Sequence, residues 1–320
     1  MSSDSVHTGR IVRTDAKVCH VEVGGRVWLC QPRGILFEAG SAQKNPLAVG
    51  DSVSVDLASD PPSIDAVLPR RNWLGRTASS HDPREQVLVA NVDQLLAICS
   101  MAKPSFSSNR TDRILAACTW HNIPATLVLN KTDLAKPQDI AAVRETYEDI
   151  DVGVLETSVP MNRGIDALRE KLRDKVSVLY GGSGVGKSSL LNALQPGLKL
   201  KVGKISKYWD QGKHTTAFSQ LHQLDFGGWV IDTPGIRAFR LHKATPADLR
   251  GMFPEFARVS AKCRFPDCSH NHEPECAVFE AVEAGEIAAS RFASYVEMLD
   301  EIAPPPQADD VVTESSDDDE

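Results

Sequence analysis

The sequence predicts a chain of three folded parts: a small all-β barrel, an α/β domain with a parallel sheet, and a mainly helical C-terminal domain. Three observations lead to this prediction. Short β-like runs broken by Gly and Pro fill the first 68 residues, apolar runs alternate with helical stretches from residue 87, and a Cys/His cluster interrupts helical segments after residue 243. The 320 residues, 42% of them apolar, are enough for such a multidomain chain.

The N-terminal part, residues 1–68, is predicted to be a barrel of the OB type. Its β-like runs are 9–14, 17–23, 26–32, 51–57 and 62–68, and glycines or prolines separate them. Five short strands at close spacing fit this barrel, although the count alone also fits other small barrels. The next stretch, 69–86, is polar and basic with little periodicity, so we expect it to be a linker.

Residues 87–243 alternate between apolar runs of strand length and helical stretches. The candidate strands are 92–100, 125–130, 152–158, 175–181, 220–226 and 228–235, with helices such as 109–121 and 187–194 between several of them. This alternation predicts an α/β sheet with helices on both faces.

A phosphate-binding motif follows one of these strands. GGSGVGKS, residues 181–188, fits GxxxxGK[S/T], comes after the apolar run VSVLY and opens a helical segment. Its glycines let backbone N–H groups curl around phosphate, Lys187 would reach the β- and γ-phosphates, and Ser188 would hold Mg²⁺. The predicted nucleotide-binding residues here are Gly181, Gly182, Ser183, Gly184, Val185, Gly186, Lys187, Ser188 and Ser189.

The base would be read by NKTD, residues 130–133, which follow the run ATLVLN. The Asp133 carboxylate can only accept hydrogen bonds, so it suits the N1–H and N2–H₂ pair of guanine, which adenine lacks. Asn130 would meet the other edge of the ring and Lys131 would pack over its face. The predicted guanine site also contains Thr132 and, after the run VGVLE, Thr157 and Ser158 near the guanine O6.

A DTPG motif, residues 232–235, follows the strand-like run GWVI. Asp232 would hold Mg²⁺ through water, and the Gly235 N–H would meet the γ-phosphate. Upstream, GKHTT offers Thr215 or Thr216 to complete the Mg²⁺ shell, and we favour Thr216. The predicted Mg²⁺ ligands are therefore Ser188, Thr216 and Asp232.

The motifs occur in an unusual order, because the base-reading segments precede the phosphate loop. This order predicts an α/β P-loop GTPase domain that is circularly permuted: the sheet stays the same and only the chain ends move. The segment after DTPG then leads directly into the C-terminal domain. We expect the nucleotide state to be transmitted to that domain.

Residues 244–303 are predicted to be a helical zinc-binding domain. CRFPDCSHNHEPEC places Cys263, Cys268, His270 and Cys276 at the spacing C-x4-C-x-H-x5-C. Three thiolates and one imidazole form a closed tetrahedral set for one structural Zn²⁺ per chain. His272 is an alternative histidine ligand, and unligated cysteines are the other alternative. We expect the remaining cysteines, at 19, 30, 99 and 118, to be core residues.

The net charge of −8 is concentrated at the C-terminal end. Residues 304–320 contain seven acidic residues and no basic one, so the rest of the chain carries −1, and this composition predicts a disordered tail. The N-terminal segment MSSDSVHTGR fits neither a secretory signal nor a transit peptide, and no apolar run has membrane-spanning length. An odd number of cysteines, seven, suggests a reducing compartment. We expect a cytoplasmic protein without a membrane partner.

In this order, ANVDQLLAI, NKTD, GGSGVGKSSLLNAL, GKHTT, DTPGIRAF and the Cys/His cluster resemble the RsgA (YjeQ) family over roughly residues 8–300. The resemblance implies an OB barrel, a permuted GTPase domain and a zinc domain. It also implies a factor that binds the small ribosomal subunit late in assembly, hydrolyses GTP there and helps release other assembly factors. We therefore expect GTP or GDP, the small subunit with its rRNA, and other assembly factors as partners of a monomer.

The residue that would position the attacking water differs from that of many GTPases. Ile236 stands where many GTPases carry a water-orienting glutamine, so intrinsic hydrolysis should be slow. Our hypothesis is that the bound subunit organises GKHTT so that His214 positions the attacking water; the alternative is that His214 contacts RNA or nothing. The predicted catalytic residues are Lys187, His214 and Thr216. Gly184 replaces an asparagine that some related GTPases use with potassium, so potassium dependence stays open.

Basic residues near the phosphate loop suggest an RNA-facing surface. Six lysines lie between 187 and 220, with Tyr208 and Trp209 among them, a mixture that suits phosphate contacts and base stacking. The alternative is a solvated switch loop. Further phosphate contacts could come from Arg10, Arg13, Arg26 and Arg33 of the barrel and from Arg70, Arg71 and Arg76 of the linker.

Two other classes of function fit the same motifs. One is a GTP-gated rRNA-binding scaffold with little hydrolysis, which the missing glutamine permits. The other is a metal-trafficking GTPase, against which the closed Cys3His set argues, because delivery needs exchangeable ligands. GTP turnover with and without small subunits separates the first from an enzyme that the subunit stimulates.

Overall fold

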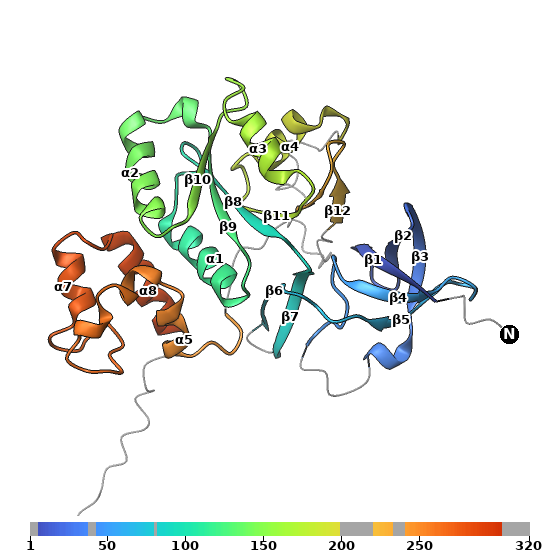
Figure 1. The fold of residues 1–320 in the computed structure, drawn as a ribbon, viewed down its shortest axis with the longest axis horizontal. Coiled ribbons are helices and arrows are strands. Elements are labelled where there is room, and N and C mark those ends of the chain that lie inside the picture. Colours follow the sequence, from blue (N-terminus) through green and yellow to red (C-terminus); the bar gives the residue numbers. More distant parts are fainter. Residues whose placement is uncertain (1–5, 38–42, 80–81, 199–219, 233–240, 303–320) are drawn as a thin grey trace, which may run out of the picture. The chain divides into compact units, whose positions relative to one another are not determined.

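The computed structural model describes residues 6–37, 43–79, 82–198, 220–232 and 241–302 (Figure 1). The chain divides into two compact units, residues 1–243 and 244–320. Within the described ranges, no helix combines the length and apolar character needed to cross a membrane. The predicted acidic tail, 304–320, lies outside these ranges.

The first strands of unit 1 close into a barrel. They are β1 (Val6–Thr14), β2 (Cys19–Val23), β3 (Arg26–Pro32), β4 (Ser52–Asp56) and β5 (Ser63–Val67), with the 3-10 helix η1 (Gly34–Phe37) after β3. The strand order is β1-β2-β3-β5-β4, and antiparallel pairing of β1 with β4 closes it. Ile11, Val21, Val53, Val55 and Ile64 fill the interior and are fully buried. The predicted OB-type barrel and its five strands are confirmed.

The stretch that we predicted to be a linker is a β-hairpin instead. It consists of β6 (Trp73–Ser79) and β7 (Asp82–Ala90), which pair in antiparallel fashion. Leu74 and Val89 point into the core of the α/β part, and neither is exposed. Register shifts after Leu74 and Thr77 interrupt the alternation of apolar and polar residues, which hid the strand pattern in the sequence.

A buried ion pair joins this hairpin region to the barrel. The guanidinium of Arg70 contacts both carboxylate oxygens of Asp51, with Nε–Oδ1 at 2.7 Å and Nη2–Oδ2 at 2.8 Å. Nη1 donates to Gln43 at 2.8 Å and Nη2 also donates to the Pro46 carbonyl at 3.0 Å. The side chain of Asp51 is 0% exposed and that of Arg70 is 10% exposed. Arg70 therefore stabilises the fold through this ion pair and is not a free phosphate-binding group.

Replacing Arg70 with methionine is expected to destabilise unit 1 by about 3–5 kcal/mol, because the Asp51 carboxylate would stay buried without its cation. Urea denaturation followed by circular dichroism measures the change. The matched control is Arg84→Met, which removes an exposed arginine paired with Asp82 on the same hairpin and should leave the midpoint unchanged. Equal midpoints for the two variants would contradict this role of Arg70.

The α/β part contains a sheet of parallel strands with one antiparallel strand. Its strands are β8 (Gln94–Ser100), β9 (Ala125–Asn130), β10 (Gly153–Thr157), β11 (Val176–Tyr180), β12 (Gln220–Gln223) and β13 (Trp229–Asp232). The order is β10-β9-β8-β11-β13-β12, and only β12 runs antiparallel to its neighbour β13. Arg13 of β1 pairs with Gln220 of β12, so the barrel strands continue the same sheet.

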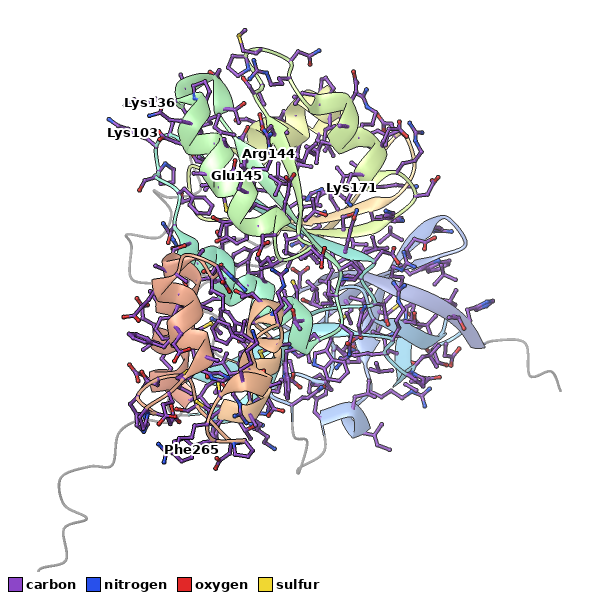
Figure 2. All side chains as sticks on the ribbon, turned by 60° about the vertical axis from the view of Figure 1, so that its left-hand side comes forward. Lys103, Lys136, Arg144, Glu145, Lys171 and Phe265 are labelled. Atoms are coloured by element: carbon purple, nitrogen blue, oxygen red, sulfur yellow. The ribbon has the colours of Figure 1, made fainter. Side chains whose placement is uncertain are left out.

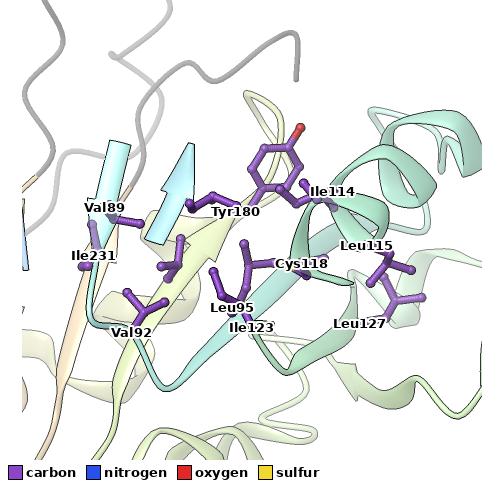
Figure 3. Packing of buried hydrophobic residues seen from close by; sticks show 14 of the residues in the cluster. Val89, Val92, Leu95, Ile114, Leu115, Cys118, Ile123, Leu127, Tyr180 and Ile231 are labelled. Atoms are coloured by element: carbon purple, nitrogen blue, oxygen red, sulfur yellow. The ribbon is translucent and has the colours of Figure 1, made fainter. Parts of the chain in front are cut away.

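Helices cover both faces of this sheet, as predicted. They are α1 (Ser108–Trp120), α2 (Pro137–Glu148), α3 (Ile165–Leu172) and α4 (Lys187–Leu194), with the 3-10 helices η2 (Thr132–Leu134) and η3 (Pro196–Leu198). One apolar cluster contains residues of α1 and α2, and Figure 3 shows Ile114 and Cys118 of α1 beside Tyr180. The opposite cluster contains residues of α3 and α4. Adjacent strand residues such as Leu95 and Leu96 belong to opposite clusters, which is the period-two pattern of a doubly covered sheet.

The core cysteines fit the prediction from their apolar neighbours. Cys19, Cys30 and Cys118 are buried, and the half-buried Cys99 packs against the first cluster. Burial raises the pKa of the Cys19 thiol to about 12 and also raises that of Cys118. These thiols stay protonated at neutral pH, which makes them poor nucleophiles.

Unit 2 is built mainly from short helices. They are α5 (Pro246–Gly251), α6 (Pro254–Ala257), the 3-10 helix η5 (Ser260–Lys262), α7 (Ala277–Glu283) and α8 (Ala289–Ile302). Aromatic rings form its core, with the centroids of Phe256 and Tyr295 4.9 Å apart. Arg291 Nε lies 2.8 Å from Glu255 Oε1, and both side chains are almost fully buried. The predicted helical C-terminal domain is confirmed.

Candidate nucleotide-binding site and metal centre

The sheet brings three of the predicted motifs to one edge. The phosphate loop follows β11, NKTD overlaps and follows the end of β9, and Thr157 ends β10. Since these strands are parallel, their carboxyl ends lie at the same edge, which is where α/β proteins bind ligands. Asp232 ends β13, and its backbone pairs in register with Leu179 of β11. The segments that we expect to bind the base, the phosphates and Mg²⁺ therefore begin at the ends of neighbouring strands.

Two glycines of the phosphate loop adopt conformations that other residues avoid. Gly184 has φ 79° and Gly186 has φ 106°. A Cβ atom on Gly186 would also lie 2.3 Å from Nδ2 of Asn130, closer than any real contact. The loop can thus approach the NKTD segment only because glycine stands at this position.

The loop lysine folds over the loop itself. Nζ of Lys187 donates to the carbonyl oxygens of Gly181 at 2.7 Å and Gly182 at 3.3 Å. Lys187 is the first residue of α4, and Ser188 and Ser189 follow it in the first turn, each partly buried. A cation, a helix N-terminus and a hydroxyl therefore meet at one point, a combination that favours a phosphate group.

Hydrogen bonds tie the NKTD segment to the phosphate loop. Asn130 is 2% exposed, and its Nδ2 donates to the Val185 carbonyl at 2.8 Å. Lys131 has a left-handed backbone with φ 62°, and its Nζ donates to the carbonyls of Gly184 at 2.6 Å and Lys103 at 2.5 Å. We predicted that Asn130 would meet the base edge, and the structure shows its amide group holding the two loops together. The sequence gave no signal for Lys103, because only its backbone carbonyl takes part.

The Asp133 carboxylate, which we predicted to read guanine, is held by the loop after β10. Oγ of Ser158 donates to Oδ1 of Asp133 at 2.6 Å, and the other carboxylate oxygen has no partner among the described residues. Ser158 is itself fixed by backbone hydrogen bonds with Arg163 at 2.9 and 3.0 Å. Thr132 donates to the Thr157 carbonyl at 3.2 Å. Asp133 is exposed and oriented, as a group that reads a ligand must be.

Several predicted site residues lie outside the described ranges. These are His214, Thr215, Thr216, Gly235 and Ile236, together with the lysines between 199 and 213. Of the predicted Mg²⁺ ligands, the structure places Ser188 in the first turn of α4 and the backbone of Asp232 at the end of β13.

The predicted barrel arginines are partly engaged by the protein. Arg13 Nη2 lies 2.9 Å from Asp15 Oδ1, and Arg33 Nε lies 2.8 Å from Asp65 Oδ1. The guanidinium of Arg26 stacks over the ring of Trp28 at 4.3 Å. Carboxylates thus partly neutralise Arg13 and Arg33, whereas the guanidinium of Arg26 keeps its charge while it stacks on Trp28.

The four predicted zinc ligands of unit 2 come together. The ligand atoms of Cys263, Cys268, His270 and Cys276 all lie within 4.8 Å of one another. Nδ1 of His270 is 3.6 Å from Sγ of Cys276 and 3.7 Å from Sγ of Cys263. Tetrahedral coordination at ordinary Zn–S and Zn–N lengths puts ligand atoms about 3.5–3.8 Å apart. His272 is exposed and outside this group, so the structure favours His270 over that alternative.

Burial shifts the pKa of two of these predicted ligands. It lowers the pKa of His270, so the imidazole is neutral at pH 7 and can offer a lone pair. It raises the pKa of the Cys268 thiol to about 12. Such a thiol would stay protonated alone, whereas a bound divalent cation stabilises the thiolate.

Hydrogen bonds from side chains outside the Cys3His group fix the backbone around it. The Glu273 carboxylate accepts the N–H groups of Ser269 at 2.6 Å, Asn271 at 3.2 Å and His272 at 3.3 Å. The Tyr295 hydroxyl donates to the Ser269 carbonyl at 2.6 Å, which links the cluster to α8. These supports were not predictable, since they depend on backbone positions rather than on a residue motif.

Comparison with known proteins gives the family. A model of the RsgA GTPase family matches residues 67–242. "Small ribosomal subunit biogenesis GTPase RsgA 2" of Bacteroides thetaiotaomicron is 37% identical over 276 residues, covering 85% of this chain and 89% of that protein. "Small ribosomal subunit biogenesis GTPase RsgA" of Thermotoga maritima is 39% identical over 285 residues, covering 88% of this chain and 90% of its own.

Solved structures agree with this result. The crystal structure of YjeQ from Thermotoga maritima superimposes with a TM-score of 0.73 at 35% identity, covering 94% of this chain and 99% of that one. The crystal structure of YloQ, a circularly permuted GTPase, gives a TM-score of 0.66 at 30% identity and covers 94% and 97%. The family match spans more than half of the chain and the relatives align over most of it. The chain therefore belongs to the RsgA GTPase family, with a circularly permuted GTPase domain.

Proposed function

We propose that the protein is a GTPase that acts as a late assembly factor of the small ribosomal subunit. It hydrolyses GTP to GDP and phosphate when the subunit stimulates it, and it promotes subunit maturation and the release of other assembly factors. The relatives named as small ribosomal subunit biogenesis GTPases support the partner. We further propose that it works in the cytoplasm as a monomer and contacts rRNA.

One observation carries the nucleotide assignment: Ser158 holds one oxygen of Asp133 beside a phosphate loop that is bonded to the same NKTD segment. Asp133 reads the N1–H and N2–H₂ groups of guanine, and Lys131 packs on the ring. Lys187 and the loop N–H groups bind the phosphates. The other proposed GTP-binding residues are those of the phosphate loop, Asn130, Thr132, Thr157, Ser158, Asp232 and Gly235.

Mg²⁺ and catalysis complete the proposal. Ser188, Thr216 and Asp232 would hold Mg²⁺, whose chemistry is to neutralise charge on the phosphates. His214 would position the attacking water once the subunit organises its segment. Ile236 cannot orient water as a glutamine would, so the free protein should turn over slowly.

In unit 2, we propose that Cys263, Cys268, His270 and Cys276 hold one structural Zn²⁺. The donor set supports this assignment, because three sulfurs and one neutral imidazole within bonding geometry are typical of closed zinc sites. A bound zinc ion would cross-link η5, the following loop and α7.

GTP turnover by the purified protein, alone and with isolated small ribosomal subunits, tests the function. We expect slow turnover alone and a rise of at least about 10²-fold with the subunit, because the missing organisation of the catalytic segment would be supplied in trans. ATP is the control nucleotide. Tight GTP binding with flat turnover would contradict an enzyme and favour the GTP-gated rRNA-binding scaffold, which Ile236 permits.

A further inference from the structure

We propose that Arg110 is a further catalytic residue of this site, an arginine supplied in cis that contacts the γ-phosphate of bound GTP. The inference rests on the proposed GTPase function. It assigns a role to a side chain that belongs to none of the sequence motifs.

The fold places Arg110 at the edge where the nucleotide motifs meet. It lies in the first turn of α1 (Ser108–Trp120), whose N-cap is Ser107. This helix follows β8, and β8 is the direct neighbour of β11, the strand that leads into the phosphate loop. The start of α1 and the phosphate loop therefore begin at adjacent strand ends.

Two cations converge on one glycine of the loop. A Cβ atom built on Gly182 would lie 3.6 Å from Nη1 of Arg110, which is ordinary van der Waals contact. Nζ of Lys187 approaches the carbonyl of the same Gly182 to 3.3 Å. The guanidinium thus reaches the phosphate loop from the side of α1, while the lysine reaches it from α4.

The charge of Arg110 also acts on the residue that precedes the loop. Burial raises the pKa of the Tyr180 hydroxyl, and the positive charges of Arg110 and Arg113 oppose that rise. Tyr180 is the last residue of β11. This electrostatic effect agrees with the short distance from Arg110 to Gly182.

The guanidinium of Arg110 is available for a ligand. Its side chain is exposed, and among the residues that the structure describes it makes no ion pair or hydrogen bond. Its helix neighbour Arg113 differs, because Nε of Arg113 donates to Asn109 Oδ1 at 3.0 Å. Arg144 on α2, which is labelled in Figure 2, forms an ion pair with Glu156. Arg110 therefore combines closeness to the phosphate loop with an uncommitted cation.

A cation at this position would stabilise the negative charge that develops during GTP hydrolysis. Water attacks the γ-phosphorus, the bond to the β–γ bridging oxygen breaks, its electron pair stays on GDP, and the water proton passes to the released phosphate. Negative charge collects on the γ-oxygens and the bridging oxygen, and an arginine stabilises it through bidentate hydrogen bonds. Since Ile236 replaces the usual glutamine, a larger share of the stabilisation falls on cations.

Arg110→Ala tests the inference in the subunit-stimulated turnover assay. We expect kcat to fall about 10³-fold while the affinity for GDP changes less than about twofold, because the contact forms with the γ-phosphate. The affinity for GDP with aluminium fluoride, which mimics the transferring phosphoryl group, should fall with kcat. Arg110→Lys should recover only part of kcat and of the affinity for the fluoride complex, since a lysine cannot form the bidentate contact.

The matched control is Arg173→Ala, which removes an exposed arginine at the end of α3 that pairs with Glu170. This variant should keep the kcat and both affinities of the unmodified protein. If Arg110→Ala keeps kcat and the affinity for the fluoride complex within twofold, the inference fails although the GTPase function stands. Equal losses of GDP and GTP binding would overturn it as well, by showing that Arg110 only shapes the loop. If the unmodified protein binds GTP but neither turns it over nor binds the fluoride complex, the proposed function and the inference both fail.

Discussion

Replacing Asp133 with asparagine is expected to lower the affinity for GTP by about 10³- to 10⁴-fold and to create affinity for xanthosine triphosphate. The carboxylate offers acceptors to both N1–H and N2–H₂ of guanine. An asparagine NH₂ group would instead face N2–H₂, donor against donor. Xanthine carries a carbonyl at that ring position, so the same NH₂ group would find an acceptor.

The contact with Ser158 makes the outcome specific. Its hydroxyl donates to one oxygen of Asp133 at 2.6 Å and can donate in the same way to the carbonyl oxygen of an asparagine. The introduced NH₂ group is then left at the position of the other carboxylate oxygen, the one without a partner among the described residues. We therefore expect a change of specificity rather than collapse of the loop.

Titration with fluorescent GTP and xanthosine triphosphate measures both affinities. Asp139→Asn is the matched control, because Asp139 is an exposed acid in the first turn of α2, six positions along the chain. It should change neither affinity. Retained GTP binding by Asp133→Asn would remove the guanine-reading role from this residue. Loss of both nucleotides would show a structural role instead.

Removing the proposed Zn²⁺ from unit 2 is expected to unfold residues 244–302 while unit 1 stays folded. The helices α5, α6 and α7 contain six, four and seven residues, too short to be stable alone. Structural zinc in small domains contributes about 10–16 kcal/mol of apparent binding free energy, which is folding free energy when the site forms only in the folded state. Without it, the loop between Cys263 and Cys276 keeps hydrogen bonds such as the one from Tyr295 to the Ser269 carbonyl, and each of these contributes far less.

Hydrogen exchange on peptides of unit 2, with and without a strong chelator, checks this expectation, and elemental analysis should give one zinc per chain. Cys268→Ser should lose the zinc and the protection from exchange together. His272→Ala is the matched control, since His272 is exposed and outside the cluster, and it should keep both. Full zinc content in Cys268→Ser, or zinc loss in His272→Ala, would refute the ligand set.

Much of the fold could be predicted because its signals are local. Runs such as ATLVLN and VSVLY are continuous apolar segments of strand length, and the structure places them as β9 and β11. The segment from Lys187 to Leu194 was predicted as a helix and is α4 with the same bounds. Strand–loop–helix order then located the phosphate loop, and residue spacing alone located the Cys3His group.

The parts that could not be predicted depend on contacts between distant residues. The hairpin β6–β7 is stabilised by Leu74 and Val89, which pack against α1 and the sheet, and its register shifts break the alternation. Arg70 looked like an RNA contact until its partner Asp51, 19 positions away, was seen to be buried beside it. Asn130 belongs to a known motif, but its bond to the Val185 carbonyl depends on how two loops meet.

The strand order has a consequence for how the protein is made. β11 lies between β8 and β13 in the sheet, yet it is synthesised after β8, β9 and β10. A nascent chain that stops before β11 can pair those three strands, but one edge of β8 stays open until the central strand emerges. The hydrogen bonds of Asn130 and Lys131 likewise cannot form until Val185 and Gly184 of the phosphate loop have been synthesised. The ability to hold a nucleotide is therefore acquired late during translation, only after the centre of the sheet has been filled.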